Sequence, residues 1–226
     1  MNVVYTAIFG GSDGLKRAPA GPDRCVCFAD DEKLTGPGWE IVVWPKAERP
    51  RRAARLTKMT PHKLFPQAEA SVWVDGSIEI YRWDALMTDC ADAEIACLAH
   101  PDRTNCYDEA RTVVRLERAH PSKVDEAIAI YRADGFAPAA LSTTGLLYRK
   151  HTPAVQAFNE LWRDHLDRFG INDQVHADYC AWKVGAKVKH LRGHYRDNPY
   201  TFYDRVDHHA RRQPQFDQGD RCDHYL

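Results

Sequence analysis

The chain has 226 residues, a length at which one α/β domain can bury a sizeable core. Its 31 lysines and arginines nearly balance its 32 aspartates and glutamates, so no overall field draws it toward nucleic acid or anionic lipid. With 44% hydrophobic residues the composition excludes a disordered chain, and no apolar run approaches the ~20 residues of a membrane span. We expect a single domain over residues 1–226, with its core at about 3–209 and a polar, His-rich C-terminal tail.

The cysteines and the first residues of the chain indicate the cellular compartment in which the protein is expected. The seven cysteines include no Cys-x-x-Cys pair and no metal-finger spacing, which predicts buried thiols in a reducing environment. The apolar start lacks the basic segment and the small-residue cleavage site of a secretory signal. We therefore expect a soluble, cytoplasmic protein.

The first half of the chain predicts strands alternating with helices. Apolar runs bounded by Gly, Pro and Asp predict strands at residues 3–9, 24–29, 39–44 and 71–74, the last continuing through 78–80. The basic segment 49–65 has apolar residues at helical intervals, and Pro61 must end or kink that helix. Strands that alternate with helices favour an α/β fold with a mainly parallel sheet.

The second half continues the pattern. We predict a strand at residues 95–98, a helix at 122–133, a strand at 141–148 and a helix at 153–169. A further helix of roughly a dozen residues follows Asn172-Asp173-Gln174. In the remaining segment the sequence shows little periodicity.

Polar residues collect where the predicted strands end. In open α/β sheets, ligands bind at the carboxyl ends of the strands, because loops and helix N-termini converge there. The residues expected at such ends are Gly10, Gly11, Asp13, Asp30, Asp75, Gly76, His100 and Arg103. Any one of them taken alone is better explained as a turn residue at a strand end.

Asp75 directly follows the apolar run VWV, where a partly buried carboxylate needs a hydrogen-bond donor or a cation. Mg²⁺ or Mn²⁺ would satisfy it, since one or two carboxylates plus substrate phosphates hold such ions. A turn with Gly76 and Ser77 would satisfy it as well. Phosphate contacts are expected from the basic helix, at Arg52, Arg55, Lys58 or Lys63, although such a charge run is also typical of a solvated helix face.

Several enzyme classes lack their sequence signals here. The chain has no G-x-G-x-x-G, G-x-x-x-x-G-K-[ST] or G-x-S-x-G motif, which removes the signals for a dinucleotide oxidoreductase, a P-loop enzyme and an α/β-hydrolase. Cys106 with His100 or His120 would make a thiol nucleophile and base, but a buried structural cysteine explains Cys106 better.

A series of segments carries a resemblance to a known family: YTAIFGGSDGL, CFADDEKL with GWEI, RAARLTKMTPHKLFP, SVWVDGSIEI, HPDRTNCYDEA and NDQVHADYCAWK. Over residues 3–209 the chain resembles the glycosyltransferase-like family of the plant mucilage-synthesis type. That family was long catalogued as a domain of unknown function and also occurs in bacteria and phages. The resemblance implies a type-A glycosyltransferase fold.

The layout is more remotely similar to the glycogenin-type retaining glycosyltransferases. There an apolar strand ends in D-x-D, a later strand carries S-G, and a D-Q pair follows a helix. The matching positions are Asp75 with Ser77, Thr144-Gly145 and Asp173-Gln174. Asp75-Gly76-Ser77 has lost one carboxylate of D-x-D, so a missing metal ligand would come from elsewhere, such as His194 or His208.

The resemblance implies transfer of a sugar from a nucleotide-diphosphate sugar, with a UDP-sugar favoured, to a glycan, protein or other acceptor, assisted by Mn²⁺ or Mg²⁺. Asp173 and Gln174 would lie beside the sugar as catalytic residues. Asp30 would hold the base or the ribose. The implied metal site is Asp75, Ser77, His194 and His208. The implied donor site is Thr6, Phe9, Gly10, Asp30, Arg55, Lys58, Lys63, Asp75, Gly76, Arg103, Thr144 and Gly145.

Two alternatives stay open. A catalytically inactive sugar- or nucleotide-binding module would keep the fold and lose the second carboxylate. A phage-type transferase that glycosylates modified DNA bases fits the small size, but the neutral overall charge does not support a nucleic acid acceptor.

Overall fold

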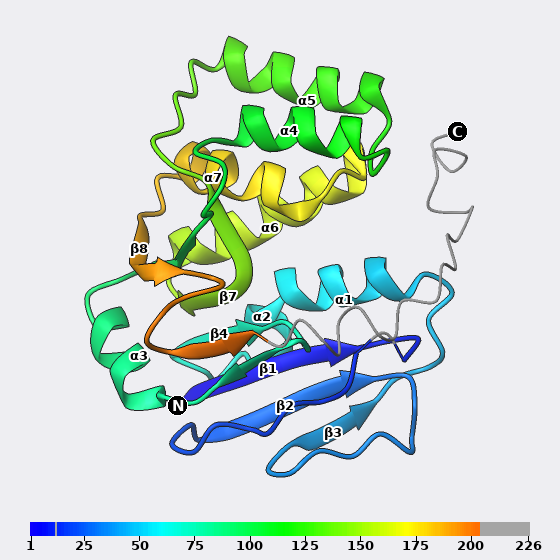
Figure 1. Cartoon of the computed structure of the whole chain (residues 1–226), viewed down its shortest axis with the longest axis vertical. Helices are drawn as coiled ribbons and strands as arrows, with labels where there is room; N and C mark the ends of the chain where they lie inside the picture. The colour runs from blue at the N-terminus through cyan, green and yellow to red at the C-terminus, as the bar shows by residue number, and fades with distance from the viewer. Residues whose placement is uncertain (12, 204–226) are drawn as a thin grey trace.

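A seven-stranded sheet forms the centre of the molecule (Figure 1). The computed structural model describes residues 1–11 and 13–203. The strand order is β3-β2-β1-β4-β7-β6-β8. Among these strands β7 is antiparallel to β4 and β6, while the other neighbouring pairs are parallel. The predicted α/β fold with a mainly parallel sheet is confirmed. The bounds are β1 (Asn2–Ile8), β2 (Arg24–Ala29), β3 (Glu40–Val43), β4 (Ala70–Val74), β6 (Ile95–Ala99), β7 (Ser142–Lys150) and β8 (Val188–His194).

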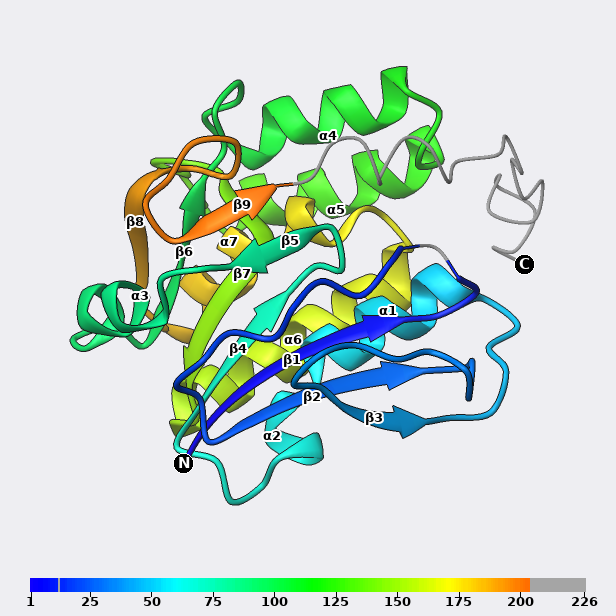
Figure 2. The ribbon, with the colours of Figure 1, turned by 60° about the horizontal axis from the view of Figure 1, so that its bottom comes forward.

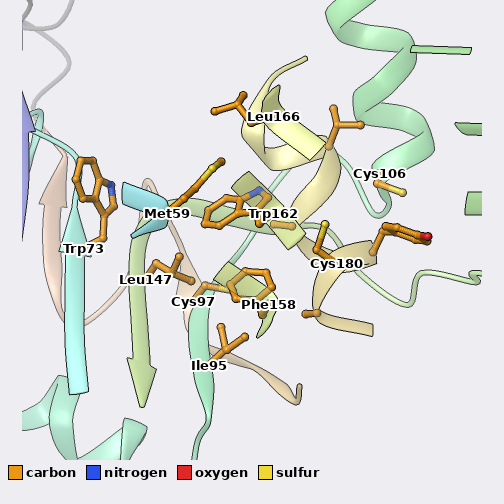
Figure 3. Close-up of a cluster of buried hydrophobic side chains, with 14 of the residues drawn as sticks. Met59, Trp73, Ile95, Cys97, Cys106, Leu147, Phe158, Trp162, Leu166 and Cys180 are labelled. Atoms are coloured by element: carbon orange, nitrogen blue, oxygen red, sulfur yellow. The ribbon is translucent and has the colours of Figure 1, made fainter. Parts of the chain in front are cut away.

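Each face of the sheet has its own hydrophobic core. One core is built from the sheet and from α1, α4, α5, α6 and α7, and Figure 3 shows its centre around Trp162 and Phe158. The other joins the sheet to α3 and to a small second sheet, and it includes Leu86 and Trp83. The helices are α1 (Pro50–Met59), α2 (Pro61–Leu64), α3 (Trp83–Cys90), α4 (Cys106–Arg115), α5 (Pro121–Ala133), α6 (Pro153–Phe169) and α7 (Asp173–Val184).

The second sheet pairs β5 (Ile78–Ile80) with β9 (Thr201–Tyr203) in antiparallel fashion (Figure 2). The sequence predicted that the strand at 71–74 continues through 78–80, but a turn separates β4 from β5, and the Ile78 N–H donates to the Asp75 carbonyl at 2.9 Å. The chain therefore leaves the large sheet at Asp75, and that carboxylate stands where two sheets meet.

Local signals explain how the helices of the site begin and end. Pro50 and Pro61 occupy first-turn positions, where a missing N–H needs no partner, and this divides the predicted helix 49–65 into α1 and α2. Gly170 ends α6 with φ of 63°, a left-handed conformation that glycine adopts without strain. Only Ile171 and Asn172 then separate α6 from α7, so Asp173 is fixed at the start of α7.

The sequence-based prediction missed two helices and two strands. Helices α3 and α4 were not predicted, and β8 and β9 lie in the segment for which little regular structure was expected. In β8 just Leu191 is fully buried, so this edge strand carries no apolar alternation to reveal it. Within the described residues, no helix combines the length and the apolarity needed to cross a bilayer.

The six cysteines in the described part of the chain are free thiols, and five of them are buried. Burial raises the pKa of Cys27, Cys90, Cys97 and Cys106 to about 12. Such thiols stay protonated and unreactive at neutral pH, so Cys106 is a structural residue rather than a nucleophile.

Candidate active site

Several predicted site residues meet at one edge of the sheet. Because β1, β2 and β4 are parallel, Gly10, Asp30 and Asp75 all follow the carboxyl ends of strands at this edge, as predicted. β7 runs the other way and so begins here, which brings Gly145 against Asp75. The Asp75 N–H donates to the Gly145 carbonyl at 2.8 Å.

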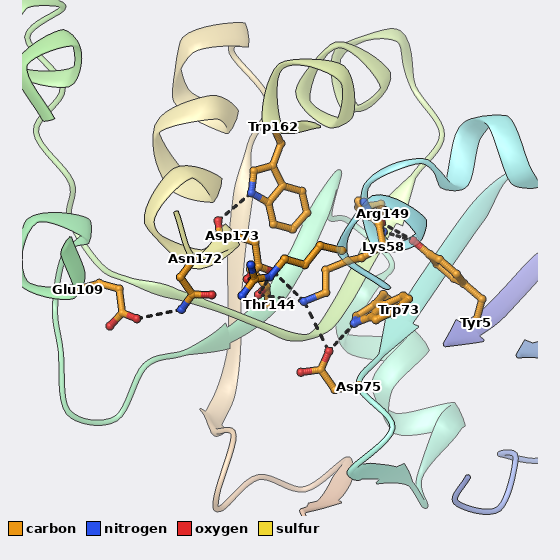
Figure 4. Close-up of polar contacts among 11 residues, drawn as sticks. Tyr5, Lys58, Trp73, Asp75, Glu109, Thr144, Arg149, Trp162, Asn172 and Asp173 are labelled. Atoms are coloured by element: carbon orange, nitrogen blue, oxygen red, sulfur yellow. Dashed lines mark hydrogen bonds and ion pairs between the residues drawn. The ribbon is translucent and has the colours of Figure 1, made fainter. Parts of the chain in front are cut away.

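Lys58, at the end of α1, is the centre of this site (Figure 4). Its Nζ lies 2.8 Å from Asp173 Oδ2 and 3.5 Å from Asp75 Oδ1. It also lies 3.3 Å from Thr144 Oγ1 and 5.4 Å from the ring centroid of Trp73. With a side-chain exposure of 7%, Lys58 is an internal cation that joins α1, β4, β7 and α7.

Opposite charges keep Lys58 and Asp173 ionised. Burial lowers the pKa of Lys58, but Asp173 and Asp75 outweigh burial and raise it. Burial raises the pKa of Asp173, but the charges of Lys58 and Arg55 and the hydrogen bonds from Lys58 and Thr144 hold it well below its usual range. Arg55 Nε lies 3.8 Å from Asp173 Oδ1. Asp173 is therefore a permanent carboxylate near neutral pH and neither gives nor takes a proton readily.

Tertiary contacts fix the start of α7. The indole N–H of Trp162 donates to the Asp173 carbonyl at 2.8 Å, and Asn172 Nδ2 donates to Glu109 Oε1 at 3.3 Å. Asn172, at the helix cap position, makes no side-chain capping bond. Glu109 is buried and forms an ion pair with Arg103. Arg103 is thus connected to the start of α7 through its ion pair with Glu109 and the hydrogen bond between Glu109 and Asn172.

Asp75 has the exposure and the space that a cation would need. Trp73 Nε1 donates to Asp75 Oδ1 at 2.7 Å, and the Asp75 side chain is 43% exposed. A Cβ at Gly145 would lie 3.0 Å from Asp75 Oδ2, so the absence of a side chain at 145 leaves room beside that oxygen. An exposed carboxylate with open space suits Mg²⁺ or Mn²⁺, whose other ligands are then water and substrate phosphates.

Of the other predicted metal ligands, His194 lies too far away to share an ion with Asp75. His194 ends β8, which is separated from β4 by β7 and β6 in the sheet. Three strand spacings amount to about 14 Å, too far for one ion to be shared with Asp75. Ser77 is buried in the turn before β5, and His208 lies outside the described residues. Within residues 1–11 and 13–203, no three His, Cys, Asp or Glu side chains gather as a metal site.

The comparisons with known proteins give the family. Residues 23–201 match the model of the TOD1/MUCI70 glycosyltransferase-like domain. The chain belongs to this family. A protein of Arabidopsis thaliana described as probable hexosyltransferase MUCI70 is 26% identical over 82% of this chain and 38% of its own length. Alkaline ceramidase TOD1 of the same plant is 24% identical over 83% of this chain and 49% of its own length. The chain thus spans less than half of either relative.

A solved structure described as the apo structure of the bifunctional glycosyltransferase WbbM also resembles the chain. The TM-score is 0.49 with 10% sequence identity, and the match covers 84% of this chain and 38% of the other. A likeness this low assigns no residue roles.

One member of the TOD1/MUCI70 family is named a ceramidase, and the described part of this chain has a serine, an aspartate and a histidine in contact, the side chains of a hydrolase triad. Ser142 Oγ donates to Asp178 Oδ1 at 2.5 Å and lies 3.0 Å from His190 Nε2. In a serine hydrolase the histidine stands between the serine and the carboxylate. Here the serine stands in the middle and is 3% exposed, so this trio is not arranged as a hydrolase nucleophile.

Asp30 performs a structural task at the same edge. Its Oδ1 accepts the Gly10 N–H at 2.8 Å and its Oδ2 accepts the Ala47 N–H at 3.1 Å. The carboxylate therefore ties the ends of β1 and β2 to the segment after β3. A Cβ at Gly10 would lie 2.8 Å from Pro50 Cγ, so glycine at this position allows α1 to start against the end of β1.

Three further predicted donor-site residues lie outside the cluster that Lys58 forms with Asp75, Thr144 and Asp173. Thr6 and Phe9 are buried, and Phe9 packs on Trp44 with ring centroids 5.9 Å apart. Lys63 is on α2 and pairs with Glu160 at 2.6 Å. By contrast, Gln174 is half-buried in the first turn of α7, next to Asp173.

Sequence reasoning missed several residues that shape the site. Trp73 lies two positions before Asp75, so strand alternation alone places both on one face, and that signal was available. Asp13 was among the residues expected at a strand end, and in the loop after β1 it lies against Gly76, since a Cβ at Gly76 would be 3.1 Å from Asp13 Cβ. Glu109 gave no comparable signal, because its role depends on how α4 packs against α7.

Proposed function

We propose that this chain transfers a hexosyl or pentosyl group from a nucleotide-diphosphate sugar, with a UDP-sugar favoured as donor, to a glycan, protein or other acceptor. The observation that supports it is the ionised cluster of Lys58, Asp75 and Asp173 at the carboxyl edge of an α/β sheet, in a chain of a glycosyltransferase-like family.

The charges of the cluster explain what the donor would require. Lys58 and Arg55 carry two positive charges, and Asp75 and Asp173 carry two negative charges. A diphosphate adds negative charge to this balanced set, and that charge grows as the leaving group departs. Asp75 would hold Mn²⁺ or Mg²⁺, which when bound offsets the charge on the leaving diphosphate.

The chain's own residues then have separate tasks. Lys58 holds Asp75 and Asp173 in fixed positions and would supply a positive charge to the diphosphate of a bound donor. Asp173 is a permanent carboxylate, and it would stabilise positive charge that develops on the sugar ring in an oxocarbenium-like transition state. Gln174, beside it, would orient the sugar through hydrogen bonds.

The direct test is a panel of nucleotide sugars incubated with the purified chain, with and without Mn²⁺, with release of the nucleoside diphosphate as the readout. We expect Mn²⁺-stimulated release with at least one donor. Binding of a donor without turnover in the presence of acceptor extracts would instead favour the inactive binding module.

One substitution tests the proposed role of Asp75 in metal binding. Asp75→Asn keeps the size of the side chain but removes its charge, so we expect loss of the Mn²⁺-dependent part of donor binding by calorimetry, with the fold intact. The matched control is Asp92→Asn, an exposed aspartate paired with Lys189 ahead of β6, which should bind as the unaltered chain does. Unchanged metal-dependent binding in Asp75→Asn would reduce Asp75 to a turn residue.

A further inference from the structure

Arg149, on β7, is a fully buried arginine directly behind the active site. Its guanidinium donates from Nη1 to Asn159 Oδ1 at 2.7 Å, from Nη2 to the Lys58 carbonyl at 2.7 Å, and from Nη2 to the Tyr5 hydroxyl. Figure 4 shows Arg149 and Tyr5 together at the backbone of Lys58. The fold thus places a cation inside its core, where an unpaired charge is costly.

The acceptors of Arg149 are neutral, which makes its position unusual. They are an amide oxygen, a peptide carbonyl and a phenol. Burial lowers the pKa of Arg149 and raises the pKa of Tyr5 to about 12. The Lys58 carbonyl belongs to the last turn of α1, where the helix dipole is negative, and this partly stabilises the guanidinium.

The contacts of Arg149 converge on one residue of the site. The Lys58 carbonyl accepts from Arg149 and also from the Tyr5 hydroxyl, at 2.7 Å each. The side chain of the same residue reaches Asp173, Asp75 and Thr144. The backbone of Lys58 is therefore fixed from behind by Arg149 and Tyr5, while its ammonium holds the two carboxylates of the site.

A series of polar contacts connects Arg149 through Asn159 and His62 to Glu160. Asn159 Nδ2 lies 3.2 Å from His62 Nδ1, and His62 Nε2 lies 2.8 Å from Glu160 Oε1. Asn159 is fully buried on α6, and His62 is on α2. These contacts lock α2 and α6 to Arg149, so the end of α1 is held by several elements at once.

We infer that Arg149 is a positioning residue of the active site: it fixes the Lys58 backbone so that the ammonium stands between Asp173 and Asp75. This rests on the proposed glycosyl transfer only for its catalytic consequence. Burying a cation against neutral acceptors brings little net stability, although removing the guanidinium would also leave the buried Asn159 Oδ1 without this donor. The placement of Lys58 is therefore tested by turnover per folded molecule, separately from any loss of stability.

The first experiment separates placement from folding. Arg149→Met has a similar length and no charge. We expect it to fold with a somewhat lower melting temperature, because buried acceptors lose their donor, while kcat for donor turnover per folded molecule falls at least tenfold and KM changes less. Arg149→Lys, which keeps the charge but reaches fewer acceptors, should recover part of the rate. A lowered melting temperature with normal kcat per folded molecule would overturn the inference.

The control for general core damage is Leu86→Ala, a fully buried residue of the core on the other face of the sheet. This change should lower the melting temperature and leave turnover per folded molecule unchanged, because Leu86 has no part in the site.

A second readout does not depend on enzymatic activity. The Lys58 ammonium is buried and hydrogen-bonded, so its protons should exchange slowly and give a ¹⁵N-correlated NMR signal, assigned by its absence in Lys58→Arg. In Arg149→Met this signal should shift or broaden, and an unchanged signal overturns the inference. If the unaltered chain turns over no nucleotide sugar, the proposed function fails, and the NMR comparison still decides whether Arg149 positions Lys58.

Discussion

Asp173 has more contacts than a helix cap requires. As the first residue of α7 it lies at the positive end of the helix dipole, which favours a carboxylate. Yet its side chain also accepts hydrogen bonds from Lys58 at 2.8 Å and from Thr144 at 3.0 Å, and it is 5% exposed. A cap alone would need neither a buried lysine nor Thr144. A helix cap and an active-site group are two possible roles for Asp173, and these contacts favour the second.

The two interpretations predict different results for Asp173→Asn. A cap substitution should cost about 1 kcal/mol of stability or less and leave turnover intact. As an active-site carboxylate, Asp173 acts mainly in the transition state, so we expect donor binding to persist while the transfer rate falls at least about a hundredfold, roughly 2.7 kcal/mol of barrier.

Gln174→Ala should show the same separation of binding from rate, without removing the partner of Lys58. The measurements are donor affinity by calorimetry and single-turnover rates on folded protein. Near-normal transfer in both variants, together with a lower melting temperature, would remove Asp173 and Gln174 from the site.

Among the helices and strands, the sequence predicted those features that depend only on residues close together in the chain. The strands that end at Asp30 and Asp75, and the break at Pro61, follow from apolar runs and from the stereochemistry of proline. The contact between Lys58 and Asp173 joins positions 115 residues apart and depends on how α1 and α7 pack, which no local pattern contains. β8 was missed because an exposed edge strand need not alternate. The sequence thus predicted candidate residues for the site, but not how they are arranged in space.

β7 offers a test of the space beside Asp75. Gly145→Ala would place a Cβ 3.0 Å from Asp75 Oδ2 and 3.1 Å from Ile78 Cδ1, closer than ordinary contacts. The carboxylate must move to accommodate the methyl group, so we expect weaker Mn²⁺-dependent donor binding, by about threefold to thirtyfold or 0.7–2 kcal/mol, and a small change in melting temperature. Calorimetry with and without Mn²⁺ measures the metal-dependent and the metal-independent parts of donor binding. Unchanged affinity would mean that the cation does not use the space beside Oδ2.

For the whole molecule, two cores on the two faces of one sheet support the site from both sides. That residues 1–226 form a single domain stays a prediction, because the description ends at residue 203 and the chain spans less than half of the relatives it matches. Within the described part, Asp30 and Arg149 stabilise opposite ends of α1, one through the loop before it and one through its last turn.

One buried and three half-buried histidines make the stability of this fold depend on pH. Burial lowers the pKa of His100, His151 and His165 to about 4, and that of His176 to about 3. The folded pKa of each is below the unfolded value of about 6.5, so as the pH falls below that value the unfolded chain binds protons that the folded chain does not. Stability therefore falls with decreasing pH, beginning near 6.5 and continuing toward the folded values. Below about 4 the lowered pKa of Asp173 adds to the loss.

We therefore expect the free energy of unfolding to fall between pH 7 and pH 5, and His176 to account for a large share. Its side chain is fully buried, Nδ1 lies 2.6 Å from the Tyr131 hydroxyl, and Nε2 has no hydrogen-bond partner in the described structure, so a second proton on this ring would be poorly accommodated. His176→Phe should reduce the slope of stability against pH by up to about 1.4 kcal/mol per pH unit, the limit for one proton. Urea denaturation at pH 7, 6 and 5 measures that slope, with His120→Asn at the exposed start of α5 as the control that should leave it unchanged. Equal slopes for the unaltered chain and His176→Phe would show that His176 does not stay neutral in the folded protein.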